Sequence, residues 1–284
     1  MGDFVIDSET LQNLSQLYKE YRNFRGEPDP LLDQYFITKE TALNRALVFD
    51  PKNYDGKRLV MIGDMDLISL FIGKVSKPKD LAVIDIDKRL PELVFKLKFK
   101  EKIRSIRFIN HDIRVRMLAV MKNQFEYVFI EPPFTIEGLE LGLSRAVQCA
   151  RKDAKSYIVL SWDYHKKSIE IVENFVDKMK LELLKVNKDF NNYTYLTPLN
   201  KKVSNVFVIK VNSNSTETIS NHYFGPLYYR ESKETPKSYR CKCGNIITVG
   251  EGGDFKNLRE LEEHGCPKCG YSGKFIYNSN VPII

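Results

Sequence analysis

From residue 57 onward the sequence alternates short apolar runs with amphipathic segments, and this alternation limits the fold more than any other feature. Five runs rich in β-branched and aromatic residues predict strands at 58–62, 81–85, 105–109, 127–130 and 156–160. Segments with helical spacing of apolar residues lie between or after them, at 66–75, 88–99, 112–122, 136–151 and 165–179. Strands joined by helices are typical of a doubly wound parallel sheet, which the sequence therefore predicts.

Two later apolar runs extend the predicted sheet. The runs 181–186 and 205–211 are close enough in sequence to pair as an antiparallel edge. An α/β architecture with a mostly parallel sheet and such an edge has the layout of the class I methyltransferase-like Rossmann fold. The patterns G-x-G-x-x-G and G-x-x-x-x-G-K-[ST] are both absent, which argues against dinucleotide binding and against a P-loop.

The rest of the chain has other patterns. The N-terminal part predicts one helix capped by Ser8 that runs to about Phe24, and a second from Thr38 to about Val48. We therefore expect four parts: a helical segment at 1–50, a Rossmann-like domain at 51–212, a linker with an aromatic segment at 213–236 and a small module at 237–284.

Composition and charge indicate the environment of the protein. No apolar run approaches 18 residues, so no membrane span is expected. The start, MGDFVIDSE, lacks the apolar core of a secretory signal, and the cytoplasm with reduced thiols is the expected compartment. The net charge of +7 is compatible with an anionic partner but does not single one out, since lysine-rich surfaces are common.

Acidic side chains follow four of the predicted strands. Asp64 and Asp66 follow the first strand, and Asp85 ends the second. Asp112 follows the third, and Glu131 ends the fourth. In an open α/β sheet the carboxyl ends of the strands meet at the edge where ligands bind. One such acid is often a helix cap, whereas several repel one another unless a cation is present. The pattern predicts a cationic ligand, or one with an amine and sugar hydroxyls.

Two prolines follow the acid at the end of the fourth strand. In the stretch YVFIEPPFT, residues 127–135, Pro132 and Pro133 end the strand and restrict the backbone beside Glu131. We expect this turn to keep the carboxylate in place. Phe134 is expected beside it, as a wall of the pocket or as a stacking surface for a cation.

A cysteine pattern identifies the small C-terminal module. The pairs Cys241-Lys-Cys243-Gly and Cys266-Pro-Lys-Cys269-Gly are separated by 22 residues. Each pair can turn two thiolates toward one ion, which predicts a four-cysteine zinc ribbon with structural zinc. From Gly225 onward there are nine Lys or Arg against seven Asp or Glu, which is sparse for phosphate binding. A structural, dimerising or site-covering role is therefore favoured over nucleic-acid binding.

An ordered set of segments resembles the branched-chain polyamine synthases, or N4-bis(aminopropyl)spermidine synthases. The segments are DQYFITKETALNRALVF (33–49), GKRLVMIGDMDLISL (56–70), LAVIDIDKRL (81–90), EPPFTIEGLELGLSRAV (131–147) and DFNNYTY (189–195). The similarity covers roughly residues 30–212. On these segments the chain is identified as a divergent member of that family with a C-terminal zinc ribbon.

The resemblance implies a transferase that moves an aminopropyl group from decarboxylated S-adenosylmethionine to an amine of a polyamine or a related acceptor. It implies that Asp85 binds the ribose of the donor and that Asp112 lies near the adenine amine, with Gly63 in the same donor site. Three acids would orient the acceptor amine and accept its proton, namely Asp64, Asp66 and Glu131. Further contacts to the acceptor are implied for Asp33, Phe134, Asn192 and Tyr193.

The chain departs from the family pattern on the acceptor side. Met65 interrupts the acid-rich glycine motif, and Glu131 stands where the family usually has Asp. Phe134 stands where the family has an acid, and Asn192 where it has Glu. These changes bear on a long polyamine acceptor more than on the donor.

Two other functions remain open. EPPF is similar to the [DN]-P-P-[YF] turn of amino-group methyltransferases, so the donor could be S-adenosylmethionine and the acceptor an amino group in nucleic acid. In a third hypothesis the chain is a non-catalytic module that binds a nucleoside or a partner. Under the leading hypothesis the partner is a small cationic amine, a homodimer is compatible with it, and nucleic acid is not favoured.

Overall fold

The structure is a computed structural model of the chain. It describes residues 7–153, 155–163, 167–194, 197, 202–229, 237–250, 253–255 and 258–277, without the side chains of Asn23, Leu97 and Arg259. The chain divides into two compact units, Met1–Gly225 and Pro226–Ile284, and each is described by itself.

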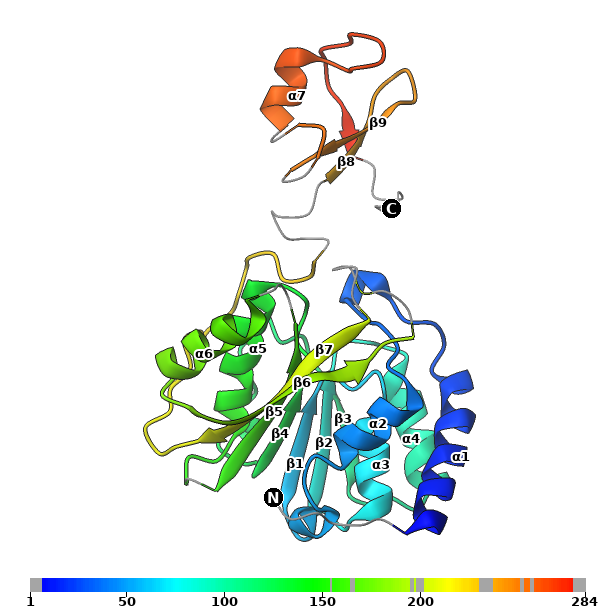
Figure 1. The fold of residues 1–284 in the computed structure, drawn as a ribbon, viewed down its shortest axis with the longest axis vertical. Coiled ribbons are helices and arrows are strands. Elements are labelled where there is room, and N and C mark those ends of the chain that lie inside the picture. Colours follow the sequence, from blue (N-terminus) through cyan, green and yellow to red (C-terminus); the bar gives the residue numbers. More distant parts are fainter. Residues whose placement is uncertain are drawn as a thin grey trace. The chain divides into compact units, whose positions relative to one another are not determined.

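A seven-stranded sheet forms the centre of the first unit (Figure 1). Its strands are β1 (Arg58–Ile62), β2 (Asp80–Asp85), β3 (Ile106–Asn110), β4 (Tyr127–Ile130), β5 (Ser156–Trp162), β6 (Glu182–Asn192) and β7 (Val203–Val211). They lie in the order β3-β2-β1-β4-β5-β7-β6. The first five strands are parallel, and β7 pairs antiparallel with β5 and β6. The predicted mostly parallel sheet with an antiparallel edge is therefore confirmed.

Helices cover both faces of the sheet (Figure 1). One face carries α1 (Ser8–Phe24), α2 (Lys39–Ala46), α3 (Ile68–Val75) and α4 (Leu90–Lys100), and the other carries α5 (Ile136–Cys149) and α6 (Ser168–Lys178). Short 3-10 helices lie at Pro30–Leu32, Pro51–Tyr54 and Ala119–Met121. Side chains alternate along a strand, so Leu59 and Met61 of β1 join the first core layer, whereas Val60 and Ile62 join the second.

The helix predicted at 112–122 is wrong. The segment contains only the 3-10 turn Ala119–Met121. Arg145 Nε donates to the carbonyl oxygen of Ile113 at 2.7 Å, and the Tyr223 N–H donates to that of Arg114 at 2.8 Å. An α-helix would need these carbonyls for its own N–H groups four residues later. Contacts with distant parts of the chain therefore replace the helical hydrogen bonds.

Two boundaries also differ from the prediction. The cap of α1 is Asp7 rather than Ser8, because the Asp7 carboxylate accepts from the Thr10 N–H at 2.7 Å. Strand β6 continues to Asn192 through two register shifts against β7, well beyond the predicted 181–186. This extension brings the end of β6 to the carboxyl ends of the parallel strands. The predicted start of α2 near Thr38 is confirmed, with Thr38 as its N-cap, whereas the helix ends at Ala46 rather than at about Val48.

The second unit is a small three-stranded sheet with one helix. Its strands β8 (Lys237–Arg240), β9 (Ile246–Val249) and β10 (Ile276–Tyr277) lie in the order β10-β8-β9, and α7 spans Leu258–His264. A few buried side chains form its core, including two of the cysteines, Cys241 and Cys266. In the described parts of both units, no helix has the length and apolar character needed to cross a membrane.

Gly142 lies where α5 packs against the turn after β4. A Cβ there would be 2.7 Å from Cβ of Pro132 and 2.9 Å from Cδ1 of Ile130. We expect Gly142→Ala to lower the free energy of unfolding, because overpacking costs about 1–3 kcal/mol and outweighs the gain in helix propensity of about 1 kcal/mol. Glu140→Ala, at a half-buried position of the same helix, should change it by less than about 1 kcal/mol. Urea unfolding measures both free energies. A Gly142→Ala variant with the free energy of unfolding of the wild type would show that α5 can shift away from the turn.

Candidate active site

The carboxyl ends of β1, β2 and β4 are neighbours, and they bring the predicted acids together. Strand β1 lies between the other two, so Asp64 and Asp66 lie between Asp85 and Glu131. The Asp64 N–H donates to Oδ2 of Asp85 at 3.1 Å. Burial raises the pKa of Asp66, and the nearby Glu131 carboxylate raises it further. The acidic edge expected from the sequence is thus present.

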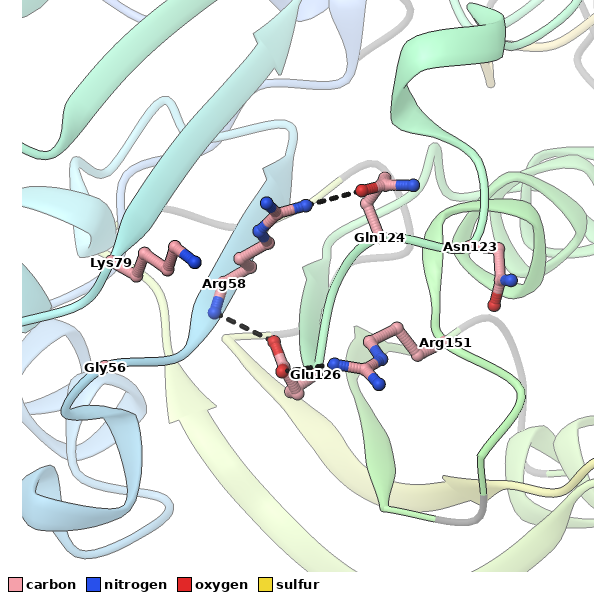
Figure 2. Close-up of a pocket in the computed structure, with 7 residues that line it drawn as sticks. All are labelled: Gly56, Arg58, Lys79, Asn123, Gln124, Glu126 and Arg151. Carbon is pink, nitrogen blue, oxygen red and sulfur yellow. Dashed lines mark hydrogen bonds and ion pairs between the residues drawn. The ribbon is translucent and has the colours of Figure 1, made fainter.

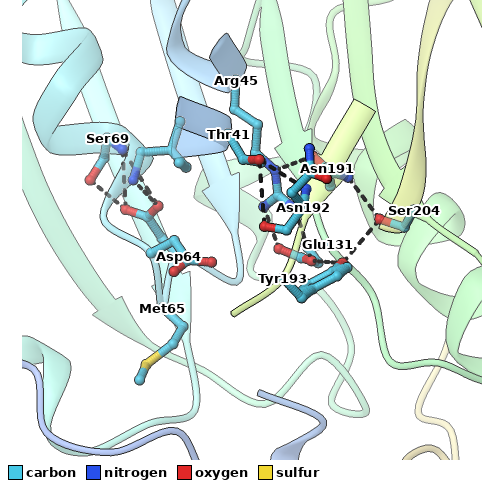
Figure 3. A network of polar contacts seen from close by, with 12 residues as sticks. Thr41, Arg45, Asp64, Met65, Ser69, Glu131, Asn191, Asn192, Tyr193 and Ser204 are labelled. Carbon is cyan, nitrogen blue, oxygen red and sulfur yellow. Dashed lines mark hydrogen bonds and ion pairs between the residues drawn. The ribbon is translucent and has the colours of Figure 1, made fainter. Parts of the chain in front are cut away.

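Glu131 is held by side chains from α2 and from the end of β6 (Figure 3). Arg45 binds both carboxylate oxygens, with Nη2 at 3.0 Å from Oε1 and Nη1 bonded to Oε2. The Tyr193 hydroxyl donates to Oε1 at 2.8 Å and lies 3.0 Å from Oγ of Ser204. Nε of Arg45 donates to Oδ1 of Asn191 at 2.8 Å. This bidentate pair fixes the direction of the carboxylate.

Asp66 is paired with a second arginine. Nη1 of Arg25 donates to Oδ1 of Asp66 at 2.8 Å, and their side chains are only 2% and 5% exposed. The guanidinium carbon of Arg25 lies 4.0 Å from the centre of the Phe36 ring. The sequence predicted that a cationic ligand would balance these acids. For Asp66 and Glu131, arginines of the chain itself provide the positive charge.

Asp64 caps the start of α3. Its Oδ1 accepts from the Ile68 N–H at 2.7 Å, and its Oδ2 accepts from the Ser69 hydroxyl at 2.5 Å (Figure 3). Burial raises the pKa of Asp64 to about 8, even though these hydrogen bonds act in the opposite direction. The Asp64 carboxyl therefore keeps its proton to a higher pH than an exposed aspartate does. The contact predicted between Asp64 and the acceptor amine remains a prediction.

The residues predicted for the donor lie at adjacent strand ends. Gly63 has φ of +79°, in the left-handed region that favours glycine. Asp85 is buried, which raises its pKa, and its carboxylate also accepts from the Asp87 N–H at 2.8 Å. Asp112 is half-buried and forms an ion pair with Arg114 at 3.0 Å. Donor binding by these residues remains a prediction.

The residues predicted for the acceptor surround the turn after β4. Oδ2 of Asp33 accepts from the Phe134 N–H at 3.0 Å, which ties the turn to the N-terminal part of the chain. The Phe134 ring is buried and lies edge-on to the rings of Tyr35 and Tyr193. The side chain of Asn192 is exposed. Their contact with an acceptor also remains a prediction.

Arg25 and Arg45 were not predicted. Arg45 lies next to Ala46 on the inward face of α2, and an arginine on such an apolar face indicates a buried ion pair. That signal was available in the sequence, although it does not name the partner. Arg25 is the C-cap of α1, a position where basic residues are common, so it carries no comparable signal.

A pocket lies at the amino ends of β1 and β4, away from the acids at their carboxyl ends; Figure 2 shows the residues that line it. It has a volume of about 400 Å³ and is lined by Gly56, Arg58, Lys79, Asn123, Gln124, Glu126 and Arg151. Arg58 begins β1, and Glu126 precedes β4, so both lie at the amino ends of strands whose carboxyl ends carry the acids. This pocket offers positions for control substitutions.

The four predicted zinc ligands converge in the second unit. The sulfur atoms of Cys241, Cys243, Cys266 and Cys269 all lie within 4.8 Å of one another. Two pairs are 3.6 and 3.8 Å apart. Tetrahedral zinc with bonds of about 2.3 Å requires sulfurs about 3.8 Å apart, so the site fits this ion. Gly244 and Gly270 follow the two pairs, with φ of +81° and +69°.

The raised pKa of Asp64 has a consequence for stability. The native state keeps a proton that the unfolded chain releases above about pH 4, so the stability from this group falls as the pH rises toward 8. We expect the wild type to lose stability relative to Asp64→Asn by up to about 1.4 kcal/mol per pH unit between pH 5 and 8. Denaturant unfolding across this range measures the difference. A difference that is constant or grows with pH would contradict a protonated Asp64.

Comparison of the sequence with known proteins identifies related chains. The sequence model of the branched-chain polyamine synthase A C-terminal domain matches residues 13–235. An uncharacterised protein of Methanocaldococcus jannaschii is 28% identical over 282 residues, which are 95% of this chain and 66% of that protein. The N(4)-bis(aminopropyl)spermidine synthase of Thermococcus kodakarensis is 27% identical over 144 residues, which are 50% of this chain and 41% of that protein. The aligned regions thus span only part of these relatives.

The fold is also similar to solved structures. The branched-chain polyamine synthase of Thermus thermophilus, in complex with N4-aminopropylspermidine and 5′-methylthioadenosine, superimposes with a TM-score of 0.67. The match has 18% identity and covers 77% of this chain and 69% of that chain, so it is a likeness of fold. Because the family model matches most of the sequence, the chain belongs to the family of branched-chain polyamine synthase A C-terminal domains.

Proposed function

We propose that the chain transfers an aminopropyl group from decarboxylated S-adenosylmethionine to an amine of a polyamine or a related acceptor. Membership of the family supports this reaction class. The Thermus thermophilus synthase with this fold binds 5′-methylthioadenosine, which is what the donor becomes after the group has left. The observation that carries the proposal is the Glu131 carboxylate, oriented by Arg45 and Tyr193 at the carboxyl edge of the sheet.

In the proposed reaction a neutral amine nitrogen attacks the carbon bonded to the sulfonium sulfur. The new C–N bond forms as the C–S bond breaks, and the electron pair of the C–S bond goes to sulfur. The nitrogen then carries an extra proton, which a carboxylate accepts. Glu131 suits this role because its side chain is 26% exposed, whereas that of Asp66 is buried. Holding the two reactants in line supplies much of the rate.

The donor side of the proposal uses adjacent strand ends. Ribose hydroxyls would donate to Asp85, whose carboxylate is already directed by backbone N–H groups of Asp64 and Asp87. Gly63 lets the backbone turn directly after β1. Asp112 follows β3, which pairs in parallel with β2, and it would approach the adenine amine.

Methyl transfer to an amino group is the second candidate. The feature that favours it is the segment Glu131-Pro132-Pro133-Phe134 directly after β4, which is similar to the [DN]-P-P-[YF] turn of amino-group methyltransferases and in which the Phe134 ring is buried. The two functions differ in product: aminopropyl transfer yields 5′-methylthioadenosine, whereas methyl transfer yields S-adenosylhomocysteine. Incubation with each donor and mass spectrometry of the products therefore separates them.

We also propose that the four cysteines of the second unit bind structural zinc. The small core of this unit includes two of the ligands, so metal binding and folding of the unit are coupled. Cys241, Cys243, Cys266 and Cys269 would hold the ion as thiolates, with all four positions occupied by sulfur. A site closed in this way supports folding rather than catalysis.

The zinc proposal predicts one zinc per chain in the purified protein. Cys243→Ser combined with Cys266→Ser should lose the metal, because two of the four ligands are removed. Cys149→Ser should retain it, because Cys149 is buried in α5 of the first unit. Elemental analysis measures the content, and a metal-free wild type prepared without chelator would contradict the site.

The role of Glu131 is tested by Glu131→Gln. We expect this change to lower kcat at least about 100-fold, because the amide cannot accept the proton. Glu126→Gln lies at the amino end of β4 and should leave kcat within about twofold (Figure 2). Formation of 5′-methylthioadenosine measures the rate, and thermal unfolding checks that each variant is folded. Near-normal turnover in a folded Glu131→Gln would remove Glu131 from the mechanism.

A further inference from the structure

On the acceptor side, Asp66 and Glu131 are each balanced by an arginine. Arg25 pairs with Asp66, and Arg45 pairs with Glu131. The two pairs are close enough to act on each other: burial lowers the pKa of Arg45, but Glu131 and, to a smaller extent, Asp66 raise it. Both arginine side chains are at least nine-tenths buried. The four groups therefore form one buried cluster without net charge.

The remaining acids of this edge are also bonded within the protein. Asp64 accepts from groups at the start of α3, and Asp85 accepts from backbone N–H groups. Asp87 pairs with Arg89 at 2.6 Å and accepts from Gln34 at 3.0 Å. Asp87 is thus balanced by Arg89, burial favours the protonated form of Asp64, and Asp85 is the acid proposed to bind the ribose of the donor.

A polycationic acceptor would therefore have to displace an arginine. Removing one partner from a buried ion pair is costly, because it leaves the other charge without compensation. Arginine remains charged at any accessible pH and binds carboxylates through a fixed fork, so a lysine-like ammonium competes with it poorly. The arrangement disfavours acceptors with several positive charges.

Two hydrogen-bond donor atoms of Arg25 are not used within the described part of the chain. Its Nε and Nη2 are buried, and neither has a hydrogen-bond partner in the part of the chain that the structure describes. Buried donors are normally satisfied, and an unsatisfied pair beside a candidate site points to a ligand that accepts. A hydroxyl, carbonyl or carboxylate oxygen would satisfy them, whereas an ammonium group, which only donates, would not.

We infer that Arg25 and Arg45 take the places of substrate ammonium groups, and that the acceptor has a single reacting amine and a nearby oxygen-bearing group rather than a chain of amines. This inference rests on the proposed transfer reaction, whose acceptor it narrows. Arg25 selects the acceptor by charge and by hydrogen bonding, and Arg45 keeps Glu131 directed at the reacting nitrogen.

The test compares three acceptors that share a three-carbon unit: 3-aminopropan-1-ol, 1,3-diaminopropane and spermidine. Each is incubated with the full chain and decarboxylated S-adenosylmethionine at low salt, and kcat/KM is measured from 5′-methylthioadenosine formation. We expect kcat/KM to fall by about tenfold or more from the amino alcohol to spermidine, which corresponds to losing one favourable contact. Product mass confirms which amine was modified.

Variants separate the charge of Arg25 from its packing. Arg25→Met should shift the ratio of spermidine to amino alcohol by about tenfold toward spermidine, because Asp66 is freed. Arg25→Lys keeps the positive charge but lacks Nε and Nη2, so its ratio should lie between those of the wild type and Arg25→Met. Arg58→Met removes a charge from the pocket at the amino ends of β1 and β4 and should preserve the wild-type ranking (Figure 2).

Several results would overturn the inference. A wild type that uses spermidine better than the amino alcohol contradicts it, whatever the variants do. A folded Arg25→Met with an unchanged ranking contradicts the role of Arg25. If no acceptor yields 5′-methylthioadenosine, the proposed reaction fails, and calorimetry with the same three amines and 5′-methylthioadenosine decides the charge preference: tighter binding of spermidine refutes it, and tighter binding of the amino alcohol supports it.

Discussion

The geometry of the carboxyl edge depends on the ion pair between Arg45 and Glu131. The pair joins α2 to the end of β4, and Tyr193 and Asn191 extend it to the end of β6. Taking two charges out of water is unfavourable, so such a pair persists only where further hydrogen bonds complete it. Here Tyr193 donates to the carboxylate, and Asn191 accepts from the guanidinium. The result is a carboxylate with one orientation.

The backbone next to Glu131 is also held in place by contacts with other parts of the chain. The Asp33 carboxylate accepts from the Phe134 N–H, and the Trp162 indole donates to the carbonyl oxygen of Pro133 at 3.1 Å. On the other side of the turn, Gly142 leaves just enough room for Pro132. Two prolines and contacts from three parts of the chain thus prevent the end of β4 from moving. A proton acceptor in a displacement reaction needs such constancy of position.

The charge balance of this edge changes how the site can select a ligand. A surplus of carboxylates would attract any polycation over a long range. Two buried arginines balance two of those carboxylates and hold them with directed hydrogen bonds, which act only at contact distance. Selection then depends on the shape and hydrogen-bonding groups of the acceptor. At Met65, Phe134 and Asn192 the chain departs from the acidic pattern of the family. These changes also reduce the negative charge of the acceptor side, since none of the three residues carries a charge.

The sequence by itself determined which strands and helices follow one another along most of the chain, the acids at the strand ends and the cysteine ligand set. These features follow from local periodicity and spacing. The sequence did not predict the open segment at 112–118, because groups on Arg145 and Tyr223, far along the chain, bind its carbonyls. Nor did it predict that Arg25 and Arg45 neutralise Asp66 and Glu131. Those partners are 41 and 86 residues apart, and only the packing of α1 and α2 against the sheet brings them together. The identities of the charged groups were therefore readable from the chain, whereas their pairing was decided by the tertiary structure.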